Sequence, residues 1–222
     1  MKPNILVITG PQGSGNHLFS KVLSMHEDVS GWDNLLREYW INHEAAPFKE
    51  IWSNPDAIAV QDWTQSNNFI ISVSGPYVDI IDGKRQTVYP NYKQVLKKLD
   101  EVGNLQVGII GRDQNIMAQG QLRKRGVESY HNFLNKIDDI TDYPHIFLSV
   151  ELLYLFRHQY LKSLGHLLNI PVDATDERLH YILNKDPNAK YIHPVENSWL
   201  DKRKRDGLLN DGSLPHDETK VD

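Results

Sequence analysis

Apolar residues cluster in four short runs along the chain. The runs cover residues 5–8, 69–75, 106–111 and 145–150, with the sequences ILVI, FIISVSG, QVGIIG and HIFLSV. Nearly continuous apolar runs of this length, rich in β-branched residues, indicate strands that are covered on both faces. The pattern therefore predicts four buried strands.

Between and after these runs, apolar residues recur with the period of a helix. The period is seen over residues 16–25, 92–102, 116–125 and 152–168. Strands that alternate with helices favour a parallel sheet with right-handed crossovers and helices on both faces. We therefore expect an α/β fold with three layers, and in such sheets a ligand binds at the carboxyl ends of the strands.

Two stretches depart from this alternation. Residues 39–68 hold three of the five tryptophans among polar residues, with Pro47 and Pro55 interrupting any helix. We interpret this stretch as an insertion that forms a wall or lid over the site. The last residues, 206–222, have the composition of a disordered tail. We expect one domain over residues 1–205, followed by a flexible tail.

Composition narrows the function classes. The chain has 222 residues, 40% of them hydrophobic, and no linker rich in proline, glycine or serine divides it, so one core is expected. The net charge of -5 gives no reason to expect binding to nucleic acid or to acidic membranes. The apolar runs are too short for a signal peptide or a membrane span. We expect a cytoplasmic protein.

Metal and thiol chemistry are not expected. The chain has no cysteine, which excludes a disulfide framework and thiol catalysis. His145, His158, His166 and His193 do not have the close spacing of metal ligands.

The first apolar run leads into a glycine-rich segment, GPQGSGNH, from Gly10 to His17. Glycines allow a tight turn that brings backbone N–H groups close to an anion, and the start of the following helix adds partial positive charge. The segment predicts a phosphate or sulfate site. The alternative is a strand-to-helix turn without a ligand.

The loop differs from the Walker loop of ATP and GTP phosphotransferases. A Walker loop needs a lysine for the β- and γ-phosphates and a serine or threonine for Mg²⁺. Here Asn16 and His17 stand at those two positions. An ordinary phosphotransferase is disfavoured, and a small-molecule kinase with a degenerate loop is the least favoured alternative.

The same segment resembles the loop that opens the sulfotransferases dependent on 3'-phosphoadenosine 5'-phosphosulfate (PAPS). The family pattern is approximately P-[KR]-S-G-[TN]-[TH]-x-[LF]. The residues that fit it are Pro11, Ser14, Gly15, Asn16, His17 and Phe19. Gly13 departs from the pattern, because the family has a lysine or arginine there that reaches the 5'-phosphate and the transferred sulfonate.

Two further segments resemble the family in its own order. Residues 23–40 resemble the stretch after the loop helix, which places Glu38 near a glutamate that serves as the base in several members. Residues 107–123 resemble the stretch whose arginine and serine bind the 3'-phosphate of PAPS. Arg112 matches that arginine, whereas Gly120 stands in place of the serine.

The resemblance continues toward the C-terminus. Residues 147–172 resemble a strand, a glutamate and a helix of the family, with Glu151 at the position of the glutamate. We interpret Glu151 as structural and expect it to pair with Arg157. The basic cluster KRKR at 202–205 resembles a C-terminal loop that closes over the nucleotide.

The resemblance implies a P-loop NTPase-like sulfotransferase fold that binds PAPS, or its product PAP, without a metal. It would transfer the sulfonate to a hydroxyl or amine of a small-molecule or glycan acceptor, with Glu38 as base and His17 donating the hydrogen bond of the missing lysine. The runner-up is a non-catalytic nucleotide-binding relative, because Gly13 and Gly120 both delete polar contacts. The implied nucleotide-binding residues are Pro11, Gln12, Gly13, Ser14, Gly15, Asn16, His17, Arg112, Gly120, Arg203 and Lys204.

Overall fold

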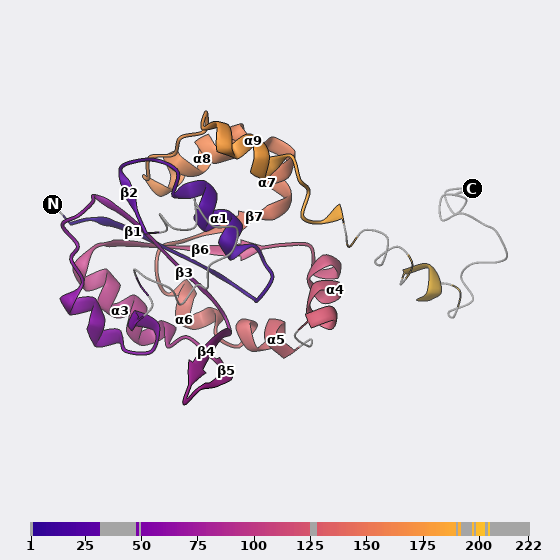
Figure 1. The fold of residues 1–222 in the computed structure, drawn as a ribbon, viewed down its shortest axis with the longest axis horizontal. Helices are drawn as coiled ribbons and strands as arrows, with labels where there is room; N and C mark the ends of the chain where they lie inside the picture. The colour runs from indigo at the N-terminus through magenta and orange to yellow at the C-terminus, as the bar shows by residue number, and fades with distance from the viewer. Residues whose placement is uncertain are drawn as a thin grey trace.

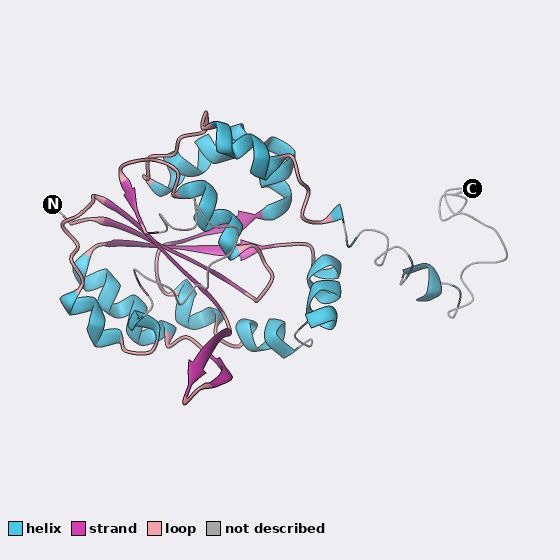
Figure 2. Cartoon of the chain, in the orientation of Figure 1, coloured by secondary structure: helices cyan, strands magenta, loops and turns pink. Residues whose placement is uncertain are grey.

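A computed structural model describes residues 2–31, 48, 50–124, 128–189, 191, 197, 199–202 and 204. Over these residues, strands and helices alternate along the chain, and a central sheet lies between two layers of helices (Figures 1 and 2). The predicted α/β architecture with three layers is confirmed.

Five parallel strands form the main sheet, in the order β2-β3-β1-β6-β7. Their bounds are β1 Asn4–Gly10, β2 Val29–Ser30, β3 Asn68–Ser74, β6 Asn104–Gly111 and β7 His145–Ser149. The four predicted strands are confirmed, whereas β2 was not predicted. Strand β1 is central, with β3 on one side and β6 on the other.

Helices and a hairpin complete the fold. Three of the four predicted helices agree well with the structure. The fourth differs: residues 152–168 are divided between two helices, because Arg157 between them has a positive φ of 46°. The elements are α1 Asn16–Leu23, η1 Glu50–Trp52, η2 Pro55–Val60, β4 Tyr77–Ile81, β5 Lys84–Val88, α3 Tyr92–Val102, α4 Gln114–Lys124, α5 Glu128–Leu134, α6 Ile137–Thr141, α7 Val150–Phe156, α8 His158–Leu168 and α9 Glu177–Leu183.

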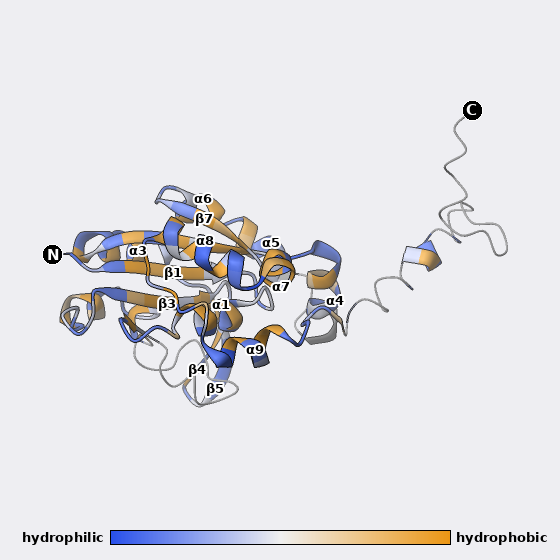
Figure 3. Ribbon diagram, turned by 90° about the horizontal axis from the view of Figure 1, so that it is seen from above, coloured by the Kyte–Doolittle hydropathy of each residue, from blue (hydrophilic) through white to orange (hydrophobic). Residues whose placement is uncertain are grey.

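Both faces of the sheet are covered. Leu6 and Ile8 of β1 pack in one core with α1, α7, α8 and α9. Ile5 and Val7 alternate with them and pack in a second core with η1, η2, α3, α5 and α6. The two helix layers are visible above and below the sheet in Figure 1, and Figure 3 shows β1 mainly in the hydrophobic colour. Burial on both faces explains the continuous apolar run of β1.

The segment expected to form a wall or lid behaves differently where it is described. Ile51, Trp52 and Ile58 of η1 and η2 are buried in the second core, and the indole of Trp63 donates to the carbonyl of Ile58 at 2.9 Å. These apolar side chains are removed from water in the core against one face of the sheet. Residues 39–47 and the predicted tail at 206–222 lie outside the described residues.

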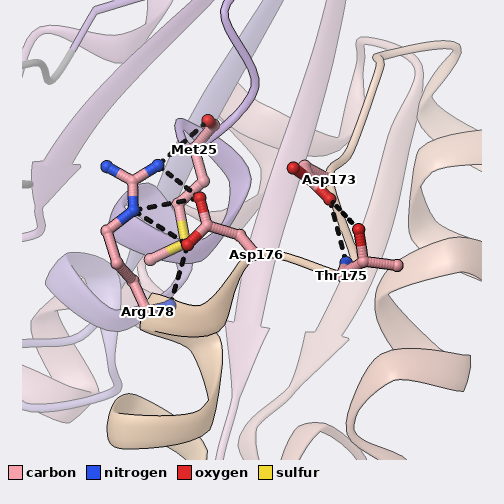
Figure 4. A network of polar contacts seen from close by, with 5 residues as sticks. All are labelled: Met25, Asp173, Thr175, Asp176 and Arg178. Carbon is pink, nitrogen blue, oxygen red and sulfur yellow. Dashed lines mark hydrogen bonds and ion pairs between the residues drawn. The ribbon is translucent and has the colours of Figure 1, made fainter.

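Helix α9 is tied to the end of the loop helix α1 (Figure 4). The carboxylate of Asp176 caps α9 by accepting from the backbone N–H of Arg178 at 2.8 Å and also accepts from its Nε. Arg178 in turn donates to the carbonyl of Met25, just after α1, at 3.4 Å. These hydrogen bonds from Arg178 hold the pKa of Asp176 below its usual value. Thr175 does the same for the pKa of Asp173.

Candidate functional site

The glycine-rich loop connects β1 to α1 at the carboxyl edge of the sheet. Gly13 has φ 86° and Gly15 has φ 122°, conformations that residues with a side chain rarely adopt. A Cβ at Gly15 would lie 3.1 Å from a methyl group of Val150. The two glycines are therefore required by the tight turn and by close packing against α7.

Ser14 and Asn16 hold the loop in place. The hydroxyl of Ser14 donates to Asn16 Oδ1 at 2.8 Å, and Asn16 Nδ2 donates to the Val73 carbonyl of β3 at 2.6 Å. Both side chains are buried, with exposed fractions of 1% and 4%. The N–H of Ser14 is also used within the loop, donating to the Pro11 carbonyl at 3.0 Å. These groups serve the loop itself, although the sequence pointed to Ser14 and Asn16 as ligand contacts.

Helix α4 contacts the first part of the loop, at Gln12. Pro11 and Gln12 are buried, and the carbonyl of Gln12 accepts a hydrogen bond from Gln121 Nε2 at 3.4 Å. Gln121 has an exposed fraction of only 2% and was not predicted as part of the site. In the sequence, only its position directly after Gly120 could have indicated that it belongs to the site.

The start of α1 offers an electropositive end to the loop. Gly15 at the N-cap has no side chain to cap the helix, and the first turn contains no acidic residue. His17, the second residue of α1, is half-buried. An uncapped helix start favours an anion through its N–H groups and its dipole.

Arg112 lies beside this loop. It follows β6, and its Nη1 donates to the carbonyl of Gly13 at 2.7 Å. The two residues are 99 positions apart in sequence and meet because β1 and β6 are neighbours in the sheet. The structure thus brings together the glycine loop and the arginine that sequence analysis singled out.

The other donors of Arg112 contact the C-terminal segment. Nε and Nη2 both donate to Asn188 Oδ1, at 3.0 and 2.6 Å, and Nη2 also reaches the Pro187 carbonyl at 3.3 Å. The ring of Tyr191 lies 5.6 Å from the guanidinium carbon. Burial lowers the pKa of Arg112 from its usual value, although arginine stays charged in proteins. Asn188 and Tyr191 were not predicted, because the periodic pattern ends near Val172.

Glu151 supports the same corner of the site. Its Oε1 accepts from the backbone N–H of Asp113 at 3.0 Å and from Asn188 Nδ2 at 3.4 Å. The expected pairing with Arg157 is wrong: Glu151 is in the first turn of α7 and Arg157 follows its last residue, and residues six apart do not face each other on a helix. Glu151 has a structural role, as expected, but with different partners.

The remaining candidates are less central. Gly120 is half-buried in α4, where a Cβ would lie 3.5 Å from the Tyr191 hydroxyl. Lys204 is exposed. Glu38 and Arg203 lie outside the described residues.

The described part of the chain has neither a cluster of metal ligands nor a membrane-spanning helix. Among the residues with a described placement, no group of three or more histidines and carboxylates could hold a metal ion. Within the same residues, no helix is long and apolar enough to cross a membrane.

The fold and the site define an α/β protein with a glycine-rich loop between a strand and a helix at the carboxyl edge of a parallel sheet. No family model matches the sequence, and no curated protein matches it. Among solved structures, the chain is similar to mouse sulfotransferase SULT7A1 complexed with PAP, with 13% identity and a TM-score of 0.43 over 83% of this chain. It is also similar to the sulfotransferase domain from the curacin biosynthetic pathway, with 14% identity and a TM-score of 0.42 over 77% of this chain.

The alignments cover 64% of the mouse enzyme and 75% of the curacin domain, so this chain spans less than two thirds of the mouse enzyme. At this level of similarity, the function has to be inferred from the site residues.

The role of Asn16 can be tested with Asn16→Asp. The new carboxylate oxygen would face the Val73 carbonyl without a proton to donate, leaving a buried charge unpaired. We expect the free energy of unfolding, measured by urea denaturation at pH 7, to fall by about 3 kcal/mol. The deficit should shrink as the pH is lowered, because the folded state raises the pKa of this carboxyl and the protonated form can donate again.

Asn67→Asp is the matched control, because Asn67 is exposed at the amino end of β3. It should change the free energy of unfolding by less than about 0.5 kcal/mol. Equal stability of the two variants would show that Asn16 does not anchor the loop.

Proposed function

We propose that the protein binds a nucleotide with two separate anionic groups, PAPS or PAP, at the carboxyl edge of the sheet. One observation carries the proposal: the Arg112 guanidinium lies 2.7 Å from the carbonyl of Gly13 in the glycine loop. A loop at a helix start and an arginine fork are two independent anion-binding devices. Placed side by side, they fit a ligand with a phosphate at each of two positions.

The loop takes the 5'-phosphosulfate and Arg112 takes the 3'-phosphate in this proposal. The first part of the loop is formed by Pro11, Gln12 and Gly13. His17, at the start of α1, lies on the side of the nucleotide. The side chains of Ser14 and Asn16 are already engaged, so binding rests on backbone N–H groups and on Arg112. The assignment of the 3'-phosphate to Arg112 follows the family resemblance.

The residue types favour binding without magnesium. The position that carries the magnesium-binding hydroxyl in a Walker loop is occupied by His17, and imidazole is a poor ligand for a hard ion that prefers oxygen. A kinase with this loop would need another source of magnesium ligands.

The proposed reaction is sulfonate transfer to a hydroxyl or amine of a small-molecule or glycan acceptor. The acceptor atom attacks the sulfur, the bond between sulfur and the bridging oxygen of the 5'-phosphate breaks, and PAP leaves. A base takes the acceptor proton, and a hydrogen bond to the bridging oxygen stabilises its developing charge. We propose Glu38 as the base, on the strength of the resemblance, and His17 as the donor.

A non-catalytic nucleotide-binding protein is the second candidate, and Gly13 favours it. A Cβ at Gly13 would meet nothing within 4 Å, so there is open space where the family has a lysine or arginine. Without that side chain, the charge that develops during transfer has less stabilisation. Release of PAP in the presence of PAPS and an acceptor distinguishes the two candidates.

Thermal denaturation with nucleotides tests the binding proposal. PAP at about a hundred times its Kd should raise the melting temperature by about 5 to 10 °C without magnesium. ATP should give a smaller shift, because it has no 3'-phosphate for Arg112. A shift that appears only with ATP and magnesium together would favour the kinase instead.

The proposed base is tested by Glu38→Gln once an acceptor is known. The amide cannot take the acceptor proton, so kcat should fall by about 10² to 10⁴ while the Kd for PAP stays within a few-fold. Glu27→Gln, at an exposed position of the same segment, is the control and should leave kcat unchanged. An unchanged kcat in Glu38→Gln would remove Glu38 from the mechanism and leave His17 as the next candidate.

A further inference from the structure

One edge of the Arg112 guanidinium group is fully used by hydrogen bonds within the protein. A guanidinium group has five N–H donors, and Asn188 Oδ1 accepts from two of them, Nε–H at 3.0 Å and one Nη2–H at 2.6 Å. The Pro187 carbonyl accepts from Nη2 at 3.3 Å. The edge formed by Nε and Nη2 is one that a phosphate or carboxylate can grip with two parallel hydrogen bonds.

The residues that cover Arg112 form a small unit, which we call the clasp and define as Pro187, Asn188 and Tyr191. The backbone N–H of Asn188 donates to Asp186 Oδ1 at 2.7 Å, and its carbonyl accepts from the N–H of Tyr191 at 2.8 Å. The Tyr191 ring lies over the guanidinium. The contacts of Asn188 with Asp186 and with Tyr191 lie within one turn of the chain, and this turn packs against Arg112.

The clasp also lies close to α7 and α4. Asn188 Nδ2 donates to Glu151 Oε1 at a long 3.4 Å. The Tyr191 hydroxyl lies 3.5 Å from the position that a Cβ would take at Gly120. A Cβ there would be in ordinary van der Waals contact with the tyrosine.

The Asn188 contact with Arg112 is of a kind that a phosphate can replace. An amide oxygen is a neutral acceptor, whereas a phosphate oxygen is charged, and hydrogen bonds between two charged groups are roughly twice as strong as neutral ones. Burial lowers the pKa of Arg112, and the nearby carboxylates of Glu151 and Asp186 act in the opposite direction.

We propose that Asn188 makes an autoinhibitory contact in the nucleotide site: its side-chain oxygen occupies the place of a 3'-phosphate on Arg112 and yields it only to a ligand that carries one. The inference rests on the proposed function and adds its regulation. Nucleotides without a 3'-phosphate leave the clasp closed, so they gain nothing from Arg112. Those with a 3'-phosphate have to open it, and their apparent Kd is the intrinsic Kd divided by the fraction of molecules in which the clasp is open.

Calorimetric titration of the full chain with PAP and with adenosine 5'-phosphate tests the inference. Asn188→Ala removes the competing acceptor and should tighten PAP about three- to thirty-fold, with little change for adenosine 5'-phosphate. Asn188→Asp puts a competing carboxylate on Arg112 and should weaken PAP by about ten-fold or more. Asn184→Ala, an exposed position before the clasp, should change neither Kd.

The outcomes separate the two proposals. Weaker or unchanged PAP binding by Asn188→Ala, with PAP still bound by the unaltered protein, would overturn the clasp and leave the proposed function standing. If neither the unaltered protein nor Asn188→Ala binds PAP, the clasp and the proposed function are both overturned.

Hydrogen exchange on the unaltered protein gives an independent measurement. Saturating PAP should speed exchange of the side-chain amide hydrogens of Asn188, because their hydrogen bond to Glu151 breaks when the Asn188 side chain leaves Arg112, and adenosine 5'-phosphate should not. Slower exchange of these hydrogens with PAP would contradict the inference.

Discussion

The buried amide of Asn16 is the interaction on which the candidate site depends. It accepts from Ser14 on one side and donates to the Val73 carbonyl of β3 on the other, which fixes the glycine loop to the sheet. As a consequence, the side chains of Ser14 and Asn16 are not available to a ligand. With glycine at 13 and no lysine in the loop, an anion has to be held by backbone N–H groups, the start of α1 and a cation from elsewhere.

The order of the strands in the sheet places a cationic side chain beside this loop. Because β6 is the neighbour of β1, the residue that follows β6, Arg112, arrives beside the loop and contacts Gly13. Neighbouring groups hold this arrangement from several sides: Gln121 contacts the carbonyl of Gln12, and Glu151 binds the N–H of Asp113. The site is thus assembled from β1, β6, α4 and α7, which all meet at the carboxyl edge of the sheet, where ligands bind in open α/β folds.

Much of the architecture could be predicted because it depends on local patterns. Strands β1, β3, β6 and β7 are buried on both faces and stand out as apolar runs, whereas β2 has only two residues and gives no such signal. The β4–β5 hairpin was missed because most of its residues are exposed, although Asp82-Gly83, both with positive φ, is a typical hairpin turn. In the site, the loop and Arg112 could be found from sequence. The contacts of Asn188 and Tyr191 with Arg112 could not, because they join residues more than 70 positions apart and no periodic pattern accompanies them.

The central claim is that the glycine loop and Arg112 together bind one nucleotide through two anionic groups. Calorimetry with Arg112→Ala tests it most directly, using PAP and adenosine 5'-phosphate, which differ only in the 3'-phosphate. An arginine–phosphate fork contributes about 1.5 to 3 kcal/mol, so the variant should bind PAP about ten- to a hundred-fold more weakly while its Kd for adenosine 5'-phosphate hardly changes. Equal losses for the two ligands, or no loss for either, would contradict the claim and assign Arg112 a purely structural role.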